Sequence, residues 1–99
     1  MDRPDWKGVL GEAYAHAVSY LDGLPERPVH PTADLAQLRE ALGGPLPDRP
    51  LYARDVVTDL AAAAGPGVIA SGSGRFFGFV VGGATPAALA ADWLASAWD

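Results

Sequence analysis

Among the side chains that can do covalent or acid–base chemistry near neutral pH, this 99-residue chain has one lysine and two histidines. Lys7 lies two residues after Asp5, whereas a Schiff-base lysine needs a desolvated pocket or an activating neighbour. We therefore expect Lys7 to be solvated, as lysines usually are. His16 follows Glu12 by four residues in a helical pattern, and His30 lies in a proline-rich stretch, so both are expected at the surface. They do not form the three- or four-ligand set that a zinc site needs.

The stretch SGSGRFFGFVVGG, residues 71–83, combines glycines with aromatic residues. Its first glycines follow G-x-G-x-x-x-G, one residue longer than the dinucleotide fingerprint, and no lysine follows at Walker spacing, which favours an ordinary turn over a phosphate loop. Phe76, Phe77 and Phe79 either fill a core, as aromatic residues generally do, or form the wall of a pocket. Three glycines would let the main chain pass close to a ligand or another chain: Gly78, Gly82 and Gly83. These residues complete no catalytic constellation, so we expect the chain to be inactive on its own.

Composition excludes several classes of protein. Apolar residues make up 49% of the chain and charged residues 19%, which indicates packing rather than disorder. The net charge of −5 and the scattered arginines exclude a nucleic-acid surface. Cysteine is absent, which rules out disulfides and fits a reducing compartment. The N-terminus has no apolar segment of the signal-peptide kind.

One apolar run raises the alternative of a membrane-active peptide. Residues 76–91 carry no charge, but this run is shorter than the ~20 residues that a spanning helix needs. Glycines and Pro86 also divide it into two short pieces. We therefore expect no membrane span.

Hydrophobic spacing predicts four helices joined by proline- and glycine-rich loops. The first runs from about Trp6 to Gly23 with Asp5 as its N-cap, and Thr32 is expected to open the second, which ends at a glycine pair. The third covers residues 52–64. The fourth begins at Thr85 and Pro86 and continues in mid-pattern to the last residue, as in a truncated chain. Residues 68–83 are expected to form a structured loop with a short extended piece. The pattern predicts a mainly α arm that packs on something else.

The segment SGSGRFFGFVVGGATPAALAADWLASAWD resembles the N-terminal portion of the pyridoxal-phosphate-dependent group II amino-acid decarboxylases, the aromatic-L-amino-acid and glutamate decarboxylase family. Three upstream stretches resemble it too: YLDGLPERPV, LREALGGPLPDRP and DVVTDLAAAAGPGV. The similarity covers essentially the whole chain.

The resemblance implies a fold and a set of site residues. The parent enzyme would be a homodimeric carboxy-lyase of fold type I (α/β, aspartate-aminotransferase-like) that converts an amino acid to an amine and CO2. Residues 1–70 would form a dimerisation arm, and residues 71–99 a pocket-lining loop and the first helix of the larger domain. The implied substrate-binding residues are Phe77, Phe79, Val80, Val81, Gly82 and Gly83. Family members that act on aromatic substrates have a proline and a threonine where this chain has Val81 and Gly82, so a polar contact to the substrate carboxylate is missing.

The resemblance also implies pyridoxal phosphate as the cofactor, whose ring serves as an electron sink for decarboxylation. The attachment lysine, the stacking histidine and the aspartate that pairs with the ring nitrogen would all come after Asp99. The implied partners are a second subunit and an amino-acid substrate, in the cytoplasm, without nucleic acid or membrane. The alternative is a free-standing helical interaction module without catalytic activity.

Overall fold

The computed structural model describes residues 3–78 and 82–99, and in these residues it is helical without a strand. This confirms the prediction of a mainly α chain. The elements are α1 (Trp6–Gly23), α2 (Leu35–Leu42), α3 (Ala53–Ala64), a short 3-10 helix η1 (Gly65–Gly67) and α4 (Pro86–Trp98).

The ends of α1 follow from its sequence. The Asp5 side chain accepts a hydrogen bond of 3.0 Å from the amide of Gly8, which satisfies one of the free donors at the helix N-terminus. The helix ends at Gly23, just before the first proline of the connector. Both ends of α1 are therefore where the sequence predicts them.

The start of α2 corrects one prediction. Asp34, and not Thr32, is the N-cap, and it forms a capping box in which its side chain and that of Gln37 each bond the other residue's amide at 2.8 Å. Thr32 lies two residues before the N-cap, where its amide donates to the carbonyl of Pro66 at 2.7 Å. Asp34 is the more effective N-cap because its reciprocal bonds with Gln37 satisfy two main-chain amides, whereas a threonine without such a partner satisfies at most one.

The two later helices begin without side-chain caps. Tyr52 occupies the N-cap position of α3 and Thr85 that of α4, and neither side chain bonds the helix. Pro86 is the first residue of α4, as predicted, where its fixed φ suits a helix start. η1, the Gly-Pro-Gly turn, follows directly after α3.

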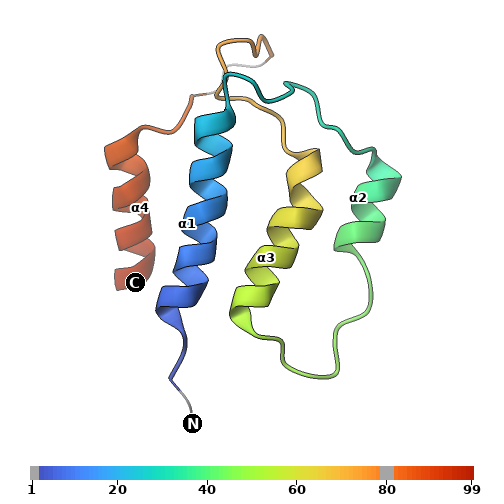
Figure 1. The fold of residues 1–99 in the computed structure, drawn as a ribbon, viewed down its shortest axis with the longest axis vertical. Helices are drawn as coiled ribbons and strands as arrows, with labels where there is room; N and C mark the ends of the chain where they lie inside the picture. Colours follow the sequence, from blue (N-terminus) through green and yellow to red (C-terminus); the bar gives the residue numbers. More distant parts are fainter. Residues whose placement is uncertain (1–2, 79–81) are drawn as a thin grey trace.

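The helices lie side by side in an open, flat arrangement (Figure 1). α3 packs against both α1 and α2, while α4 lies on the other side of α1. The molecule measures 49 × 36 × 21 Å, and its radius of gyration is 15.7 Å. A compact domain of this length would have a radius of gyration of about 13 Å.

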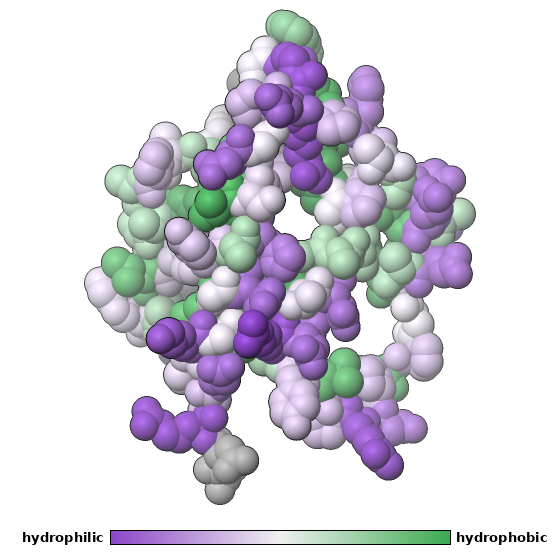
Figure 2. Space-filling view, viewed as in Figure 1, coloured by the Kyte–Doolittle hydropathy of each residue, from purple (hydrophilic) through white to green (hydrophobic). Residues whose placement is uncertain are grey.

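Little apolar surface is buried in the described residues. Within residues 3–78 and 82–99, Ala70 is the one buried hydrophobic residue and Ser73 the one buried polar residue. Large side chains such as Trp6, Leu10 and Trp98 are exposed, and Figure 2 shows hydrophobic residues distributed over the visible face among hydrophilic ones. The large apolar side chains of the helices are therefore left mostly uncovered by this chain.

In the part of the chain that the structure describes, no helix has the length and apolar character that crossing a bilayer requires.

Candidate functional site

Arg27, in the connector after α1, joins three segments. Its Nη2 donates to the carbonyl of Gly65 at 2.8 Å, and its guanidinium lies 5.0 Å from the centre of the Tyr20 ring, within cation–π range. Its own carbonyl accepts a hydrogen bond from Nη2 of Arg75. The side chain and main chain of Arg27 thus hold together three segments: the end of α1, the connector and the loop after α3.

Further hydrogen bonds align the connector with the loop after α3. The Ala70 amide donates to the carbonyl of Val29 at 3.3 Å, and the Ala33 amide donates to that of Pro66 at 3.1 Å. The Tyr20 hydroxyl donates to the carbonyl of Ile69 at 3.1 Å. Ala70 is completely buried at these contacts, and the hydrogen bonds join residues 27–33 to residues 65–70.

The glycine-rich segment that follows is a turn held by its own groups. The Ser73 amide donates to Ala70 O at 3.0 Å, and the Phe76 amide donates to Ser73 O at 3.1 Å. The amide of Arg75 donates to the Ser73 hydroxyl oxygen at 3.2 Å. Because these amides already have partners, they are not available to bind a phosphate, which supports the turn interpretation.

A pocket of about 740 Å³ lies beside this turn, within the size range of small-molecule sites. It is lined by residues 28–30 of the connector, by Ile69 and by residues 75–78 of the turn. The Phe76 ring lies so close to Gly78 that a Cβ there would be 2.9 Å from Phe76 Cζ. Glycine at position 78 therefore lets the main chain pass under the ring.

The structure places the implied substrate-binding residues in different ways. Phe77 lines the pocket and is 94% exposed, so it is not part of a core within this chain, whereas Phe76 is half-buried. Phe79, Val80 and Val81 lie outside the described residues. The remaining two, Gly82 and Gly83, are exposed, have open space at the Cβ position and do not line this pocket. A role in substrate binding stays a prediction for all six.

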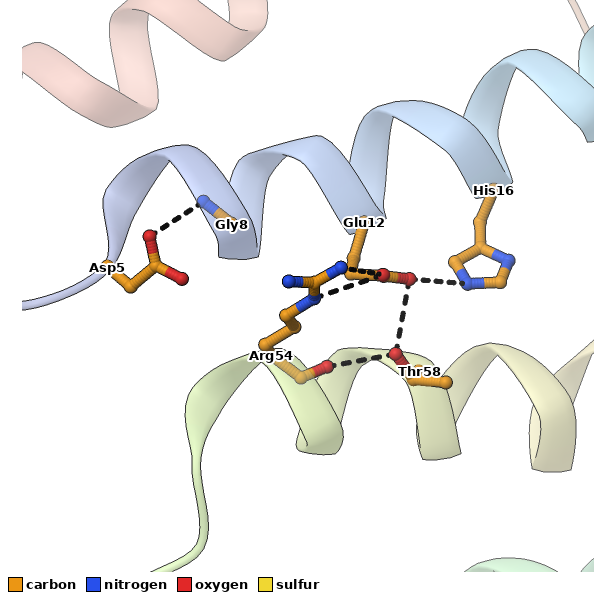
Figure 3. A network of polar contacts seen from close by, with 6 residues as sticks. All are labelled: Asp5, Gly8, Glu12, His16, Arg54 and Thr58. Carbon is orange, nitrogen blue, oxygen red and sulfur yellow. Dashed lines mark hydrogen bonds and ion pairs between the residues drawn. The ribbon is translucent and has the colours of Figure 1, made fainter.

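A second polar cluster joins α1 to α3 around Glu12 (Figure 3). Arg54 Nε and Nη2 lie 3.2 and 3.1 Å from Glu12 Oε1, and the Thr58 hydroxyl donates to Oε2 at 3.2 Å. His16 Nε2 lies 3.4 Å from the same Oε2. The hydrogen bond from Arg54, followed by that from Thr58, lowers the pKa of Glu12. A carboxylate held ionised in this way is suited to joining two helices rather than to donating a proton.

The predicted surface positions of the lysine and the histidines are confirmed, since Lys7, His16 and His30 are all exposed. His30 nevertheless lines the pocket beside the turn. In residues 3–78 and 82–99 no three side chains of metal-binding type come together. Lys7 lies in the open first turn of α1, so the described residues do not fit pyridoxal phosphate, which requires a lysine in a desolvated pocket.

Sequence reasoning missed the contacts of Arg27, Arg75 and Arg54. Their partners lie 38 to 48 residues away along the chain, and no short-range spacing signals such pairs. Phe77, in contrast, can be singled out as a candidate core or pocket residue from the glycine-rich sequence around it.

Two apolar grooves run between α1 and α4. One, of about 430 Å³, lies between residues of α1 that include Tyr14, Val18 and Leu21 and five residues of α4: Pro86, Leu89, Ala90, Trp93 and Leu94. The other, of about 710 Å³, lies nearer the start of α1, beside Trp6 and Leu10. α4 is therefore set beside α1 with unfilled apolar surface between the two helices.

Comparison with known proteins gives one relative of defined function. Aromatic-L-amino-acid decarboxylase of Mus musculus is 29% identical to the chain over 97 residues. The alignment covers 98% of this chain and 20% of the decarboxylase, so the chain spans about a fifth of its relative's length. No family model matches the chain, and no solved structure matches it. Over nearly its whole length, the chain is thus distantly similar to part of an amino-acid decarboxylase.

Proposed function

We propose that the chain acts as the N-terminal arm of a pyridoxal-phosphate-dependent amino-acid decarboxylase. Two lines of support converge: the family resemblance centred on residues 71–99, and the 29% identity to the mouse decarboxylase over 97 residues. The enzyme would release CO2 from an amino acid in the cytoplasm. The cofactor and the groups that hold it would belong to the rest of the enzyme, because the described residues of this chain do not fit it.

The observation that carries the proposal is the large uncovered surface. The accessible area of 8301 Å² exceeds by roughly 3,000 Å² the value of about 5,300 Å² typical of a folded monomer of 10.2 kDa. Obligate interfaces bury about 2,000 to 5,000 Å² summed over both partners, or about 1,000 to 2,500 Å² on each. The excess on this one chain is at least as large as one partner's share, as expected for a chain that packs against further protein.

The proposal divides the chain between two roles. Residues 1–70 would supply contacts to the second subunit of a homodimer, using the apolar side of α1. Residues 71–99 would supply a wall of the substrate pocket, including Phe77 and Gly82, and the first helix of the larger domain. The exposure of Phe77 and the open grooves beside α4 fit surfaces that further protein covers.

The test uses the native reading frame that contains residues 1–99, expressed with pyridoxal phosphate. We expect a dimer in sedimentation experiments and CO2 release from at least one amino acid in a panel of aromatic and acidic substrates. A protein that binds the cofactor and releases no CO2 from any of them would refute the decarboxylase. A reading frame that ends at Asp99, with a folded dimer, would favour the free-standing interaction module instead.

A matched pair of substitutions tests the arm separately. Leu10→Glu places a charge in the apolar groove beside α4 and should shift the protein toward monomer. Ala15→Glu introduces the same side chain at an exposed position about 140° around α1 and should leave the dimer intact. Equal dissociation constants for the two variants would refute an arm that uses this side of α1.

A further inference from the structure

A pocket of about 640 Å³ lies between the start of α1 and the start of α3, at the end of these helices opposite the glycine-rich turn (Figure 1). Two large aromatic side chains line it: Trp6, which is 65% exposed, and Tyr52, which is 83% exposed. Pro4, Val9 and Leu51 add apolar surface. This pocket shares no lining residue with the pocket beside the turn, so it is separate from the substrate wall proposed above.

The two aromatic side chains offer hydrogen-bond donors as well as rings. None of the side-chain hydrogen bonds in residues 3–78 and 82–99 uses the Trp6 indole N–H or the Tyr52 hydroxyl. Grooves lined by exposed aromatic rings bind proline-rich segments in the polyproline II conformation. The carbonyl groups of such a segment have no internal partner, because this conformation forms no internal hydrogen bonds. Free donors beside exposed rings therefore suit a proline-rich ligand.

The charges on the pocket favour a basic ligand. Four charged residues line it: Arg3, Asp5, Arg54 and Asp55. Glu12 neutralises Arg54, because its Oε1 lies 3.1 Å from Arg54 Nη2 and 3.2 Å from Arg54 Nε. Two carboxylates then stand against one remaining guanidinium. The net charge of −5 on the whole chain also attracts a cationic partner.

The chain has a proline-rich loop of its own, PLPDRP at residues 45–50, directly before Leu51. This loop is exposed and does not line the pocket. Its main chain bends at Asp48 and Arg49, which interrupts the regular three-residue turn of a polyproline II helix. Asp48 would also bring a third carboxylate to the pocket. The loop of a second copy is therefore a poor occupant, and a segment of another protein fits better.

We propose that this pocket binds an arginine-containing proline-rich segment of another protein. Its prolines pack on Trp6 and Tyr52, its carbonyls accept hydrogen bonds from the indole N–H and the hydroxyl, and its arginine pairs with Asp55. The proposal does not rest on the decarboxylase, since neither a cofactor nor an amino-acid substrate takes part. Its failure would leave the proposed function unchanged.

The test is an NMR titration of the ¹⁵N-labelled 99-residue chain with the capped peptide Ac-PPLPPR-NH2. Two matched peptides separate the contacts: Ac-AALAAR-NH2 keeps the charge without the prolines, and Ac-PPLPPE-NH2 keeps the prolines and reverses the charge. We expect the first peptide to shift the Trp6 indole signal and the amides of residues 52–55, and to bind about tenfold more tightly than either of the others. Equal affinities for the three peptides, or no binding of the first, would overturn the proposal.

Spectra of the chain without peptide, recorded at increasing concentration, distinguish another protein from a second copy. We expect the amides of residues 52–55 to keep their positions. A concentration-dependent shift of these amides that Tyr52→Ala abolishes would overturn the proposal in favour of self-association.

Substitutions of tyrosine assign the aromatic contact. Tyr52→Ala removes an exposed ring that does not cap α3, so the fold should survive and peptide binding should weaken about tenfold. Tyr14→Ala is the matched control, since it removes a 62% exposed ring from the groove between α1 and α4. Tyr52→Phe loses only the hydroxyl and should bind with an affinity between those of the wild type and Tyr52→Ala. Equal affinities for Tyr52→Ala and Tyr14→Ala would refute the aromatic contact.

A second pair of variants assigns the charge contact. Asp55→Asn should weaken binding of Ac-PPLPPR-NH2 by about threefold to tenfold. Asp59→Asn removes the same charge from an exposed position of α3 outside the pocket and should leave the affinity unchanged. Equal affinities for these two variants would refute the pairing of the ligand's arginine with Asp55.

Discussion

Replacing Arg27 by methionine tests whether one side chain holds the connector against the loop after α3. The substitution keeps much of the aliphatic length and removes the 2.8 Å bond to Gly65 O together with the guanidinium 5.0 Å from the Tyr20 ring. A partly buried hydrogen bond from a charged donor contributes about 1.5 to 3 kcal/mol, and an exposed cation–π contact about 0.5 to 1 kcal/mol. Because both act through one group and do not add fully, we expect a loss of about 2 kcal/mol.

The assay is urea unfolding of the 99-residue chain, followed by circular dichroism at 222 nm. With a slope of about 1 to 2 kcal/mol per molar urea, the midpoint should fall by about 1 to 2 M. Arg27→Lys keeps the charge without the planar fork, and we expect it to lie between the wild type and the methionine variant. Arg49→Met is the control, since it removes an arginine from the exposed loop. A midpoint for Arg27→Met equal to that of the control would refute the reasoning.

Three further changes probe other contacts. Folding lowers the pKa of Glu12, so the ionised carboxylate stabilises the fold above its unfolded-state pKa, and this contribution is lost as the pH falls through the folded-state pKa. Glu12→Gln should therefore reduce stability at pH 7 and make stability depend less on pH in acid unfolding. An unchanged acid-unfolding profile would contradict this. Gly67→Ala puts a Cβ 2.8 Å from both Leu38 Cδ atoms and should lower the free energy of unfolding, measured in urea, by about 1 kcal/mol. A neutral or stabilising effect would contradict this. Asp34→Ala removes half of the capping box and should cost about 1 kcal/mol, seen as faster amide exchange in α2; unchanged exchange would show that the box contributes nothing.

The sequence predicts the helices well because their signals are local. Asp5, the glycines at the ends of the first three helices and Pro86 act within one turn of their own position. The start of α2 was misplaced because threonine and aspartate are both good caps, and only the reciprocal bond from Gln37 distinguishes them. That signal was present in the spacing of Asp34 and Gln37.

The residue types of the candidate site could be predicted from the sequence, but the contacts between these residues could not. Phe77 stands out because three phenylalanines lie among glycines, but the choice between core and pocket wall depends on what else reaches that position. The arginines that shape the pocket come from the connector and the turn, 48 residues apart. Pairing at that separation is decided by the path of the whole chain, which single-chain spacing does not encode.

The scarcity of buried apolar surface changes which interactions set the shape of this chain. In an ordinary domain, burial dominates and polar contacts adjust the geometry. Here the connector and the turn are held by arginine and main-chain hydrogen bonds around one buried alanine, Ala70, while the helices keep their apolar sides open. The contacts of Arg27 and Arg75 therefore join the connector to the turn within the chain, whereas the grooves beside α4 stay open in the described residues.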